Sequence, residues 1–223
     1  MTQRLTFVAR FRRNLEALGL TGQGAHVLVA VSGGCDSVAL LHLLRFAAGD
    51  GGPRVTAVHF DHAMRPGSEG DARWVAGLCG AWGVPLVAAR AEAAPRTEAE
   101  AREARYAFLL RAKAEAGATH LATAHHADDQ AETVLFRVLR GTGIAGLAGI
   151  PAADERGVVR PLLPFWRAEI RRYARAHGLR WRTDPTNRLL DLARNRIRHD
   201  LLPLLRTFNP AIEEALARTA AQA

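Results

Sequence analysis

The segment Ser32-Gly33-Gly34-Cys35-Asp36-Ser37 has the residue types of a phosphate-binding turn. It follows an apolar run at Val27–Val31 and leads directly into a helical pattern. Glycines let backbone N–H groups converge, and a helix start adds unpaired amides and a positive dipole end. Ser32 and Ser37 add hydroxyl donors. The segment therefore predicts a site for an extended phosphate, in which Asp36 either holds Mg²⁺ or caps the helix.

A second polar cluster occupies residues 123–133, with the sequence TAHHADDQAET. The pattern puts it at the carboxyl end of a strand and in the first helical turn that follows, where open parallel sheets bind ligands. Asp128 is in position to cap this helix. Asp129 and Glu132 are three residues apart and share one helix face. Two carboxylates in a cleft suit an ammonium ligand or a metal ion.

The same cluster contains two adjacent histidines, His125 and His126. His125 at the strand end is a candidate contact for a phosphate or a base, and His126 fits a core position equally well. A histidine with two acids also resembles a metal triad. The positive turn nearby favours a shared nucleotide pocket over a metal site made by protein ligands alone.

Arginines supply two further groups of candidates. Arg105 lies in a long helical pattern, where it points either toward the strand ends or into surface ion pairs. Arg194, Arg196 and Arg198 open a late helix. Because residues at i, i+2 and i+4 cannot share one helix face, we expect Arg194 and Arg198 to pair and Arg196 to face solvent or a partner.

Two other phosphate motifs do not fit this sequence. A Walker A loop needs a lysine after its second glycine, and the one lysine of the chain is Lys113, in the middle of a helical pattern. Residues 141–146 match GxGxxG as a string, but they follow a helix rather than a strand. We interpret them as a helix stop followed by a loop.

The elements that must position these residues alternate between strands and helices, which predicts an α/β fold with a parallel sheet and helices on both faces. Beyond Gly141 the pattern becomes mainly helical. Strands are expected at 27–31, 55–60, 85–88 and 120–124, with a short apolar stretch at 158–163. Helices are expected at 2–18, after 37, and at 68–82, 97–116, 128–140, 167–177, 195–205 and 210–220.

Composition and charge agree with a globular protein that meets a polyanion. The chain has 223 residues, 48% hydrophobic and 23% charged, which excludes collagen-like, disordered and coiled-coil proteins. Residues 1–150, the expected nucleotide-binding core, carry net +2, and the expected extension 151–223 carries net +6. Such a basic extension suits a polyanionic partner, or else is a solvated face.

Cysteine usage and the lack of apolar runs point to a protein of the cytoplasm. Cys35 and Cys79 are too few for a disulfide scaffold or a zinc ribbon. We expect no signal peptide and no membrane span. The sequence leaves open whether the chain forms a homodimer.

The SGGCDS turn resembles the SGGxDS signature of the PP-loop ATP pyrophosphatases, which cleave ATP between its α- and β-phosphates and adenylate a substrate. Further segments, in order from about residue 24 to 206, resemble the catalytic domain of the bacterial tRNA(Ile)-lysidine synthetases. They are His59-Phe60-Asp61-His62 with Arg65 and Ser68, Ala104-Arg105-Tyr106, residues 123–146, Arg160-Pro161-Leu162-Leu163, Asp184-Pro185-Thr186-Asn187, and Arg194-Asn195-Arg196-Ile197-Arg198.

This resemblance implies an ATP-dependent ligase acting on tRNA(Ile) with a CAU anticodon. The wobble cytidine O2 attacks the α-phosphate of ATP and pyrophosphate leaves. The ε-amine of free L-lysine then attacks C2, AMP leaves, and lysidine remains. The anticodon then reads AUA instead of AUG.

The resemblance also implies roles for individual residues. The implied catalytic set is Asp36, Arg105, His125, Asp129, Glu132 and Arg194, with Arg196 as the alternative to Arg194 at the α-phosphate. ATP binds to Ser32, Gly33, Gly34, Cys35, Asp36, Ser37 and His59, with Mg²⁺ on Asp36. Asp129 and Glu132 bind lysine, and Arg196 and Arg198 contact the tRNA.

Two alternatives remain. A PP-loop tRNA thiolase would need reactive cysteines or an iron–sulfur cluster. A basic RNA-binding module would bind tRNA with steep salt dependence and consume no ATP. Many members of the resembled family continue with further tRNA-gripping domains, whereas this chain ends at Ala223. We therefore expect the basic region 160–206 to supply more of the contacts to the tRNA.

Overall fold

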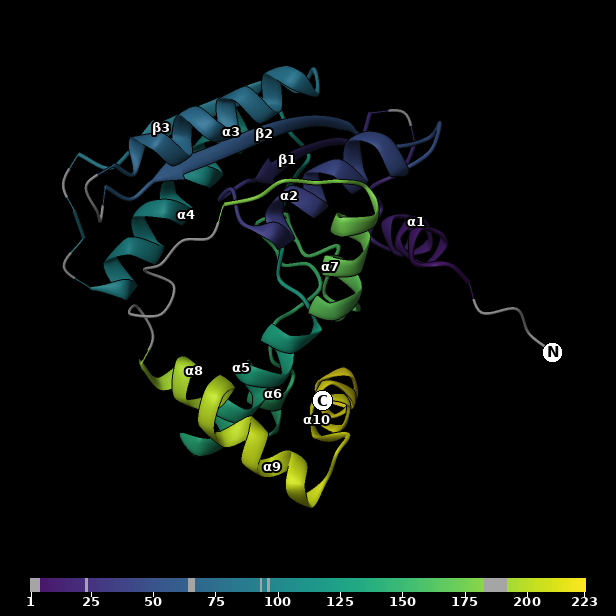
Figure 1. Ribbon diagram of the computed structural model, residues 1–223, viewed down its shortest axis with the longest axis vertical. Helices are drawn as coiled ribbons and strands as arrows, with labels where there is room; N and C mark the ends of the chain where they lie inside the picture. Colours follow the sequence, from purple (N-terminus) through teal and green to yellow (C-terminus); the bar gives the residue numbers. More distant parts are fainter. Residues whose placement is uncertain (1–4, 23, 64–66, 93, 96, 183–191) are drawn as a thin grey trace.

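The computed structural model describes residues 5–22, 24–63, 67–92, 94–95, 97–182 and 192–223 (Figure 1). Arg65 and residues 184–187, which carry part of the family resemblance, lie outside the described residues. No helix among the described residues is both long enough and apolar enough to cross a bilayer.

A five-stranded parallel sheet forms the centre of the molecule, in the order β3-β2-β1-β4-β5. The chain moves outward from β1 to β2 and β3, then crosses back to place β4 on the other side of β1. Open α/β sheets bind ligands at the carboxyl edge where the strand order reverses, which here lies between β1 and β4. The strands are β1 His26–Ala30, β2 Arg54–Asp61, β3 Leu86–Arg90, β4 His120–Ala122 and β5 Val158–Val159.

Helices cover both faces of the sheet, as the sequence predicts. Alternation along β1 sends Val27 and Val29 into one core and Leu28 into the other. Helices α1 Phe7–Ala17, α2 Cys35–His42, α3 Glu69–Ala81 and α7 Arg167–Ala176 cover the first face, and a π-helical turn at Leu43–Ala47 extends α2. Helix α4 Glu98–Glu115 covers the second face.

The remaining helices form a smaller group below the sheet (Figure 1). Helix α5 starts at the sheet edge and ends among them, where Leu135 packs against Ile197 and Leu202. The predicted helix stop after α5 is confirmed, since Gly141 takes a φ of +76°, but the predicted loop contains a one-turn helix. These elements are α5 Ala127–Leu139, α6 Ile144–Leu147, α8 Leu192–Arg196, a π-helical turn Ile197–Leu201, α9 Leu202–Phe208 and α10 Ile212–Gln222.

The segment after residue 150 contributes to the main core as well as to the lower helices. Strand β5 extends the sheet, and Ile170 and Ala174 of α7 are fully buried in the core beside α2. Phe165, just before α7, is 1% exposed and meets Phe7 of α1 edge to face at 4.9 Å. The main core is therefore completed by the N-terminal helix α1 and by the segment that begins after residue 150.

This closure predicts a large effect of Phe165→Ala on stability. We expect the free energy of unfolding to fall by about 3–5 kcal/mol, because the change removes a fully buried ring and leaves a cavity. Urea unfolding followed by circular dichroism measures it, with Phe208→Ala as the control, since Phe208 is 82% exposed. A loss below about 1 kcal/mol for Phe165→Ala would contradict this packing.

Candidate active site

The turn after β1 has the geometry of an anion cradle. Gly33 takes a φ of +87°, which favours glycine, whereas Gly34 is extended and serves as the N-cap of α2. Ser37 Oγ accepts the Ser32 N–H at 3.2 Å and donates to the Gly34 carbonyl at 3.0 Å. The first amides of a helix have no intrahelical acceptor, so those of Cys35, Asp36 and Ser37 are left for a ligand at this end of α2, whereas Val38 N–H donates to the Gly34 carbonyl at 3.0 Å.

His59 supports this turn from the neighbouring strand. Its side chain is 5% exposed, and Nδ1 lies 2.7 Å from the Val31 carbonyl, immediately before the turn. Val31 N–H in turn donates to the Val58 carbonyl of β2 at 2.8 Å. His59 therefore helps to hold Val31, and with it the start of the turn, in position beside β2. The nucleotide contact expected of His59 stays a prediction.

His126 joins the turn to the acidic cluster. Its ring is 1% exposed, and Nε2 lies 3.6 Å from Asp36 Oδ2 and 3.4 Å from Asp129 Oδ2. Nδ1 lies 3.5 Å from Asp128 Oδ2. Burial alone would lower the pKa of His126, but its contacts with Asp128, Asp36 and Asp129 raise it to about 9. The surrounding carboxylates therefore favour the protonated form of this buried ring.

The acidic residues of α5 are arranged differently from the sequence prediction. Helix α5 begins at Ala127, so His126 is its N-cap, and Asp129 Oδ2 accepts the His126 N–H at 3.1 Å. Asp128 Oδ2 instead accepts the backbone N–H of Arg167 at 2.8 Å. The prediction that Asp128 caps α5 is therefore wrong. Asp128 ties α5 to the start of α7, and these contacts lower its pKa to about 2 against the opposing effect of burial.

His125 is neutral, in contrast to its neighbour. Its Nδ1 lies 2.9 Å from Thr123 Oγ1, and burial lowers its pKa to about 4. The charge of Asp129 opposes this shift, while nearby arginines, Arg105 among them, add to it. Arg105 also lowers the pKa of His62, after burial, which is the larger cause. Helix α4 therefore brings the charge of Arg105 to the carboxyl edge of the sheet.

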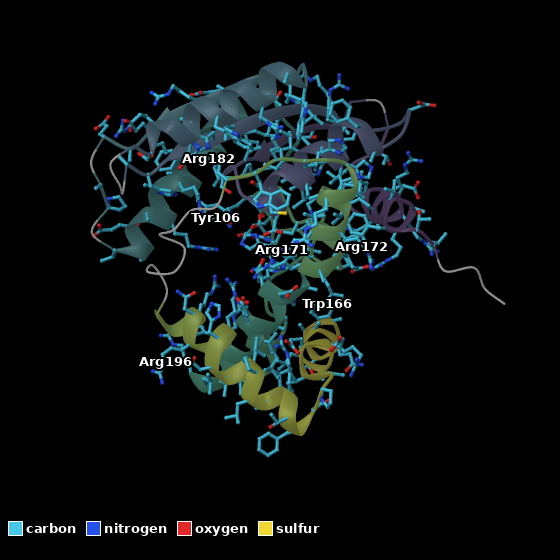
Figure 2. The ribbon with its side chains drawn as sticks, in the orientation of Figure 1. Tyr106, Trp166, Arg171, Arg172, Arg182 and Arg196 are labelled. Carbon is cyan, nitrogen blue, oxygen red and sulfur yellow. The ribbon has the colours of Figure 1, made fainter. Side chains whose placement is uncertain are left out.

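Glu132 is already paired with an arginine. Arg198 Nε and Nη2 donate to the two oxygens of Glu132 at 2.7 and 2.8 Å, and Nη2 lies 3.7 Å from Asp129 Oδ1. Glu132 is 3% exposed. Arg196, two residues earlier, is exposed and lies at the outer edge of α8 (Figure 2). Arg194 lies on the same helix and is half-buried.

Sequence reasoning missed a stripe of arginines on α7, made of Arg167, Arg171 and Arg175. Burial is the larger influence on the pKa of Asp36 and raises it, but His126, Arg167 and Arg171 hold that pKa below its usual value. Arg171 and Arg175 form no hydrogen bond or ion pair within the described part of the chain. The spacing i, i+4, i+8 indicates that the three arginines share one face of a helix. The sequence pattern does not show that this face lies near the start of α2.

Arg167 completes the ionic cluster. Its Nη2 lies 3.9 Å from Asp129 Oδ1, and its Nε lies 3.2 Å from His126 Nε2. An Nε2 that accepts this N–H carries no proton of its own, so protonation of His126 there requires Arg167 Nε to turn away and leaves Asp129 as the ion-pair partner of Arg167. Figure 2 shows Arg171 and Arg172 on opposite sides of α7, with Arg171 toward the centre of the molecule.

The residues present fit a divalent cation bound together with phosphate. Asp36 Oδ1 is buried and has no hydrogen-bond partner among the described residues, although it lies at the start of α2 beside the anion cradle. The described residues contain no group of three or more metal-ligating side chains. Mg²⁺ bound through one carboxylate and substrate phosphates needs no such group.

Comparison with known proteins identifies the family. Residues 7–205 match the PP-loop domain model. The chain belongs to the PP-loop family. Among curated relatives, this PP-loop protein is 46% identical to tRNA(Ile)-lysidine synthase of Gloeobacter violaceus, over 93% of this chain and 66% of the relative. It is 40% identical to the Thermotoga maritima protein of that name, over 88% of this chain and 49% of the relative. The expected resemblance to tRNA(Ile)-lysidine synthetases is confirmed, and the chain spans about half to two thirds of these relatives.

Solved structures agree on the fold. The U34-tRNA thiolase NcsA of Methanococcus maripaludis, solved with its [4Fe-4S] cluster, superposes with a TM-score of 0.79 at 17% identity. That alignment covers 97% of this PP-loop protein and 78% of the thiolase. The NH3-dependent NAD synthetase of Campylobacter jejuni superposes with a TM-score of 0.50 at 16% identity, over 96% and 91% of the two chains.

The buried pair between Glu132 and Arg198 predicts an asymmetric effect on stability. Arg198→Ala leaves a buried carboxylate without its counterion, so we expect the free energy of unfolding at pH 7 to fall by about 3 kcal/mol. Adding Glu132→Gln should recover most of that loss. Urea unfolding measures both variants.

Arg206→Ala is the matched control, because Arg206 pairs with Glu213 at an exposed position, where the loss should stay within about 1 kcal/mol. Equal small losses for Arg198→Ala and Arg206→Ala would show that Glu132 does not depend on Arg198.

Proposed function

We propose that this protein ligates L-lysine to C2 of the wobble cytidine of tRNA(Ile) with a CAU anticodon, in two ATP-dependent steps. The observation that carries the proposal is the position of His126, which touches Asp36 beside the PP-loop and Asp129 of the acidic pair. A triphosphate on the loop and a cationic amino acid on the acids would therefore occupy one site. Identities of 40–46% with tRNA(Ile)-lysidine synthases support the same reaction.

In the first step, cytidine O2 attacks the α-phosphate of ATP and pyrophosphate leaves. The PP-loop amides hold the β- and γ-phosphates, where fixed donors stabilise the charge that develops on the leaving group. Arg171 and Arg175, unpaired within the described residues, add positive charge beside the loop. Mg²⁺, when bound to Asp36, supplies further neutralisation of phosphate charge.

Neutral His125 and charged Arg105 complete the contacts to the α-phosphate. A neutral imidazole can donate to a phosphate oxygen through one nitrogen while Thr123 holds the other. Arg105 or Arg194 stabilises the added negative charge of the phosphoryl group in transfer. These roles are proposals that rest on the family resemblance and, for His125 and Arg105, on their common edge of the sheet.

In the second step, the ε-amine of lysine attacks C2 and AMP leaves. Asp129 and Glu132 attract the ammonium group, and one of them accepts the proton that the amine must lose to attack. Both oxygens of Glu132 accept hydrogen bonds from Arg198, so lysine must displace that guanidinium or share the carboxylate with it. Arg196 is exposed and suits a contact to the tRNA backbone, whereas Arg198 reaches RNA only if it leaves Glu132.

The alternative of a tRNA thiolase requires cysteine chemistry. Cys35 and Cys79 are the two cysteines of the chain, and both are buried. Burial raises the pKa of each thiol to about 11, so both are protonated at neutral pH. A protein that binds RNA without consuming ATP is the remaining functional alternative. The tRNA substrate of the proposed reaction implies that the protein works in the cytoplasm.

Transfer of labelled lysine tests the proposal directly. The wild-type protein with CAU-anticodon tRNA(Ile), ATP and Mg²⁺ should place label in the tRNA and release AMP and pyrophosphate. Asp36→Ala and Glu132→Ala should each lower the rate by about 100-fold or more, as loss of a transition-state or substrate contact does. Glu115→Ala is the charge-matched control, because Glu115 is an exposed carboxylate of α4 that pairs with Arg111. Tightly bound tRNA with neither label nor AMP would refute the proposal.

The cysteines give a second test. Cys35→Ala and Cys79→Ala should keep the lysine-transfer rate within about threefold of wild type, since a buried protonated thiol is only a small apolar group here. Alkylation of the native protein by iodoacetamide at pH 7 should be slow and should accelerate as pH approaches 11, because the thiolate reacts. Loss of activity in either variant without loss of fold would favour sulfur chemistry.

A further inference from the structure

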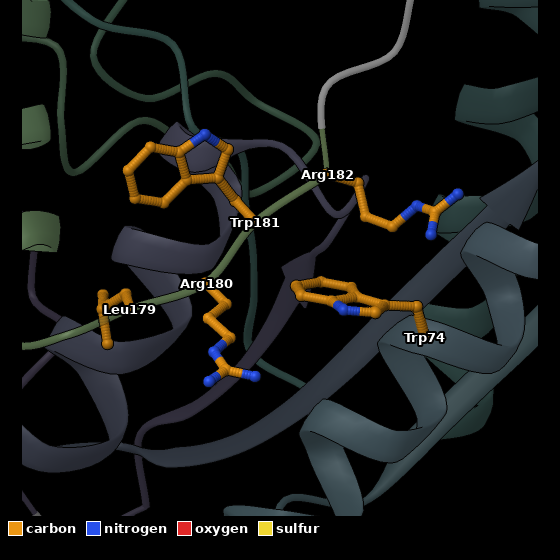
Figure 3. Close-up of a pocket in the computed structure, with 5 residues that line it drawn as sticks. All are labelled: Trp74, Leu179, Arg180, Trp181 and Arg182. Atoms are coloured by element: carbon orange, nitrogen blue, oxygen red, sulfur yellow. The ribbon is translucent and has the colours of Figure 1, made fainter.

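A surface pocket of about 580 Å³ lies beside the PP-loop and takes no part in the reaction described above (Figure 3). Its position follows from one backbone contact, in which Arg182 N–H donates to the Gly33 carbonyl at 2.9 Å. The chain that leaves α7 therefore runs across the outer side of the phosphate-binding turn. The pocket is lined by Trp74, Leu179, Arg180, Trp181 and Arg182.

Successive side chains of the segment 179–182 point to opposite sides of the backbone. Trp181 turns to one side and packs against the main core. Arg180 and Arg182 leave from the other side, and in Figure 3 their guanidinium groups lie on either side of the Trp74 indole. A planar aromatic surface is therefore flanked by two cations.

Trp74 is held in place by the turn itself. A Cβ built on Gly33 would lie 3.7 Å from Trp74 Cε3, so one part of the indole is against the PP-loop, and the residue remains half-buried. Arg182 Nε lies 2.5 Å from Asp71 Oδ1, one turn before Trp74 on α3, which fixes that guanidinium. Arg180 is exposed and has no hydrogen bond or ion pair with any described residue.

An indole face between arginines has the chemistry that single-stranded RNA recognises. Bases stack on aromatic rings regardless of sequence, and arginines bind the flanking phosphates. We propose that this pocket binds a nucleotide of the RNA substrate next to the reacting base, with that nucleotide's base stacked on Trp74 and its phosphates on Arg180 and Arg182. The identity of the RNA as tRNA rests on the proposed function, whereas the stacking site does not.

The pocket is separate from the expected site of the ATP triphosphate. On this side the turn offers the Gly33 carbonyl, which already accepts the Arg182 N–H. The triphosphate belongs at the amides that open α2, because backbone N–H groups bind an anion and a carbonyl does not. The arginines of the pocket therefore provide a second, separate phosphate site.

Binding of a fluorescent anticodon stem-loop with the CAU anticodon, measured by anisotropy without ATP or lysine, tests the proposal. Trp74→Ala should weaken binding by roughly 5- to 150-fold, the loss expected for one stacked base. Trp74→Phe should recover most of it, because phenylalanine also stacks. Arg180→Ala should reduce the slope of log affinity against log salt by about 0.7–1, as loss of one phosphate contact does.

Arg111→Ala serves as the charge-matched control and should leave both quantities unchanged. ATP affinity, measured separately, should stay within about twofold in all variants. Since Arg180 is exposed and unpaired within the described residues, its variant tests the site even if Trp74→Ala melts early.

Wild-type stem-loop binding in both Trp74→Ala and Arg180→Ala would overturn the proposal. Loss of ATP affinity with unchanged RNA affinity in Trp74→Ala would also overturn it, and would assign the pocket to adenine. If wild type transfers lysine while these variants bind RNA normally, only the pocket assignment fails. If RNA binding depends on Trp74 but no lysine is transferred, only the proposed function fails.

Discussion

His126 is a buried ring enclosed by three carboxylates that favour its protonated form, and the geometry of the whole site depends on this arrangement. A buried charge is tolerated only when it is paired, so Asp36, Asp128 and Asp129 must stay close to the ring in the folded protein. Asp36 belongs to α2 and the other two to α5. The ring therefore fixes the distance between the phosphate-binding turn and the acidic pair, which follow different strands.

Arg167 and Arg198 extend this cluster to the later part of the chain. Arg167 connects α7 to α5 through Asp128 and Asp129, and Arg198 connects the helices below the sheet to Glu132. Asp129 and Glu132 are already paired with arginines before any substrate arrives. An ammonium ligand that binds them has to exchange partners with Arg167 or Arg198.

Much of this site could be predicted from local sequence patterns. The strand-turn-helix at Ser32–Ser37 and the polar residues at 123–133 each follow a buried strand, and the topology rule for parallel sheets places both at one edge. Positive φ at Gly33 follows from the tight turn. The sheet order itself, with β4 beside β1, is what brings the two segments together.

Other parts of the site could not be predicted because they depend on contacts between distant segments. Arg198 and Glu132 are 66 residues apart, and Asp128 and Arg167 are 39 apart. The Asp128 side chain fits a helix cap by local rules, but a backbone N–H of α7 competes for it successfully. His125 and His126 have the same local signal, and only burial beside three acids separates a neutral ring from a charged one.

The proposed function requires one site that holds a triphosphate on the PP-loop and a cationic amino acid on Asp129 and Glu132. A crystal structure with a non-hydrolysable ATP analogue and L-lysine tests this requirement most directly. We expect phosphate oxygens at about 3 Å from the first amides of α2, and the lysine Nζ at a similar distance from Asp129 or Glu132, with Arg198 either displaced from Glu132 or sharing its carboxylate with the lysine. Phosphates bound away from these amides, or lysine bound away from both carboxylates, would contradict it.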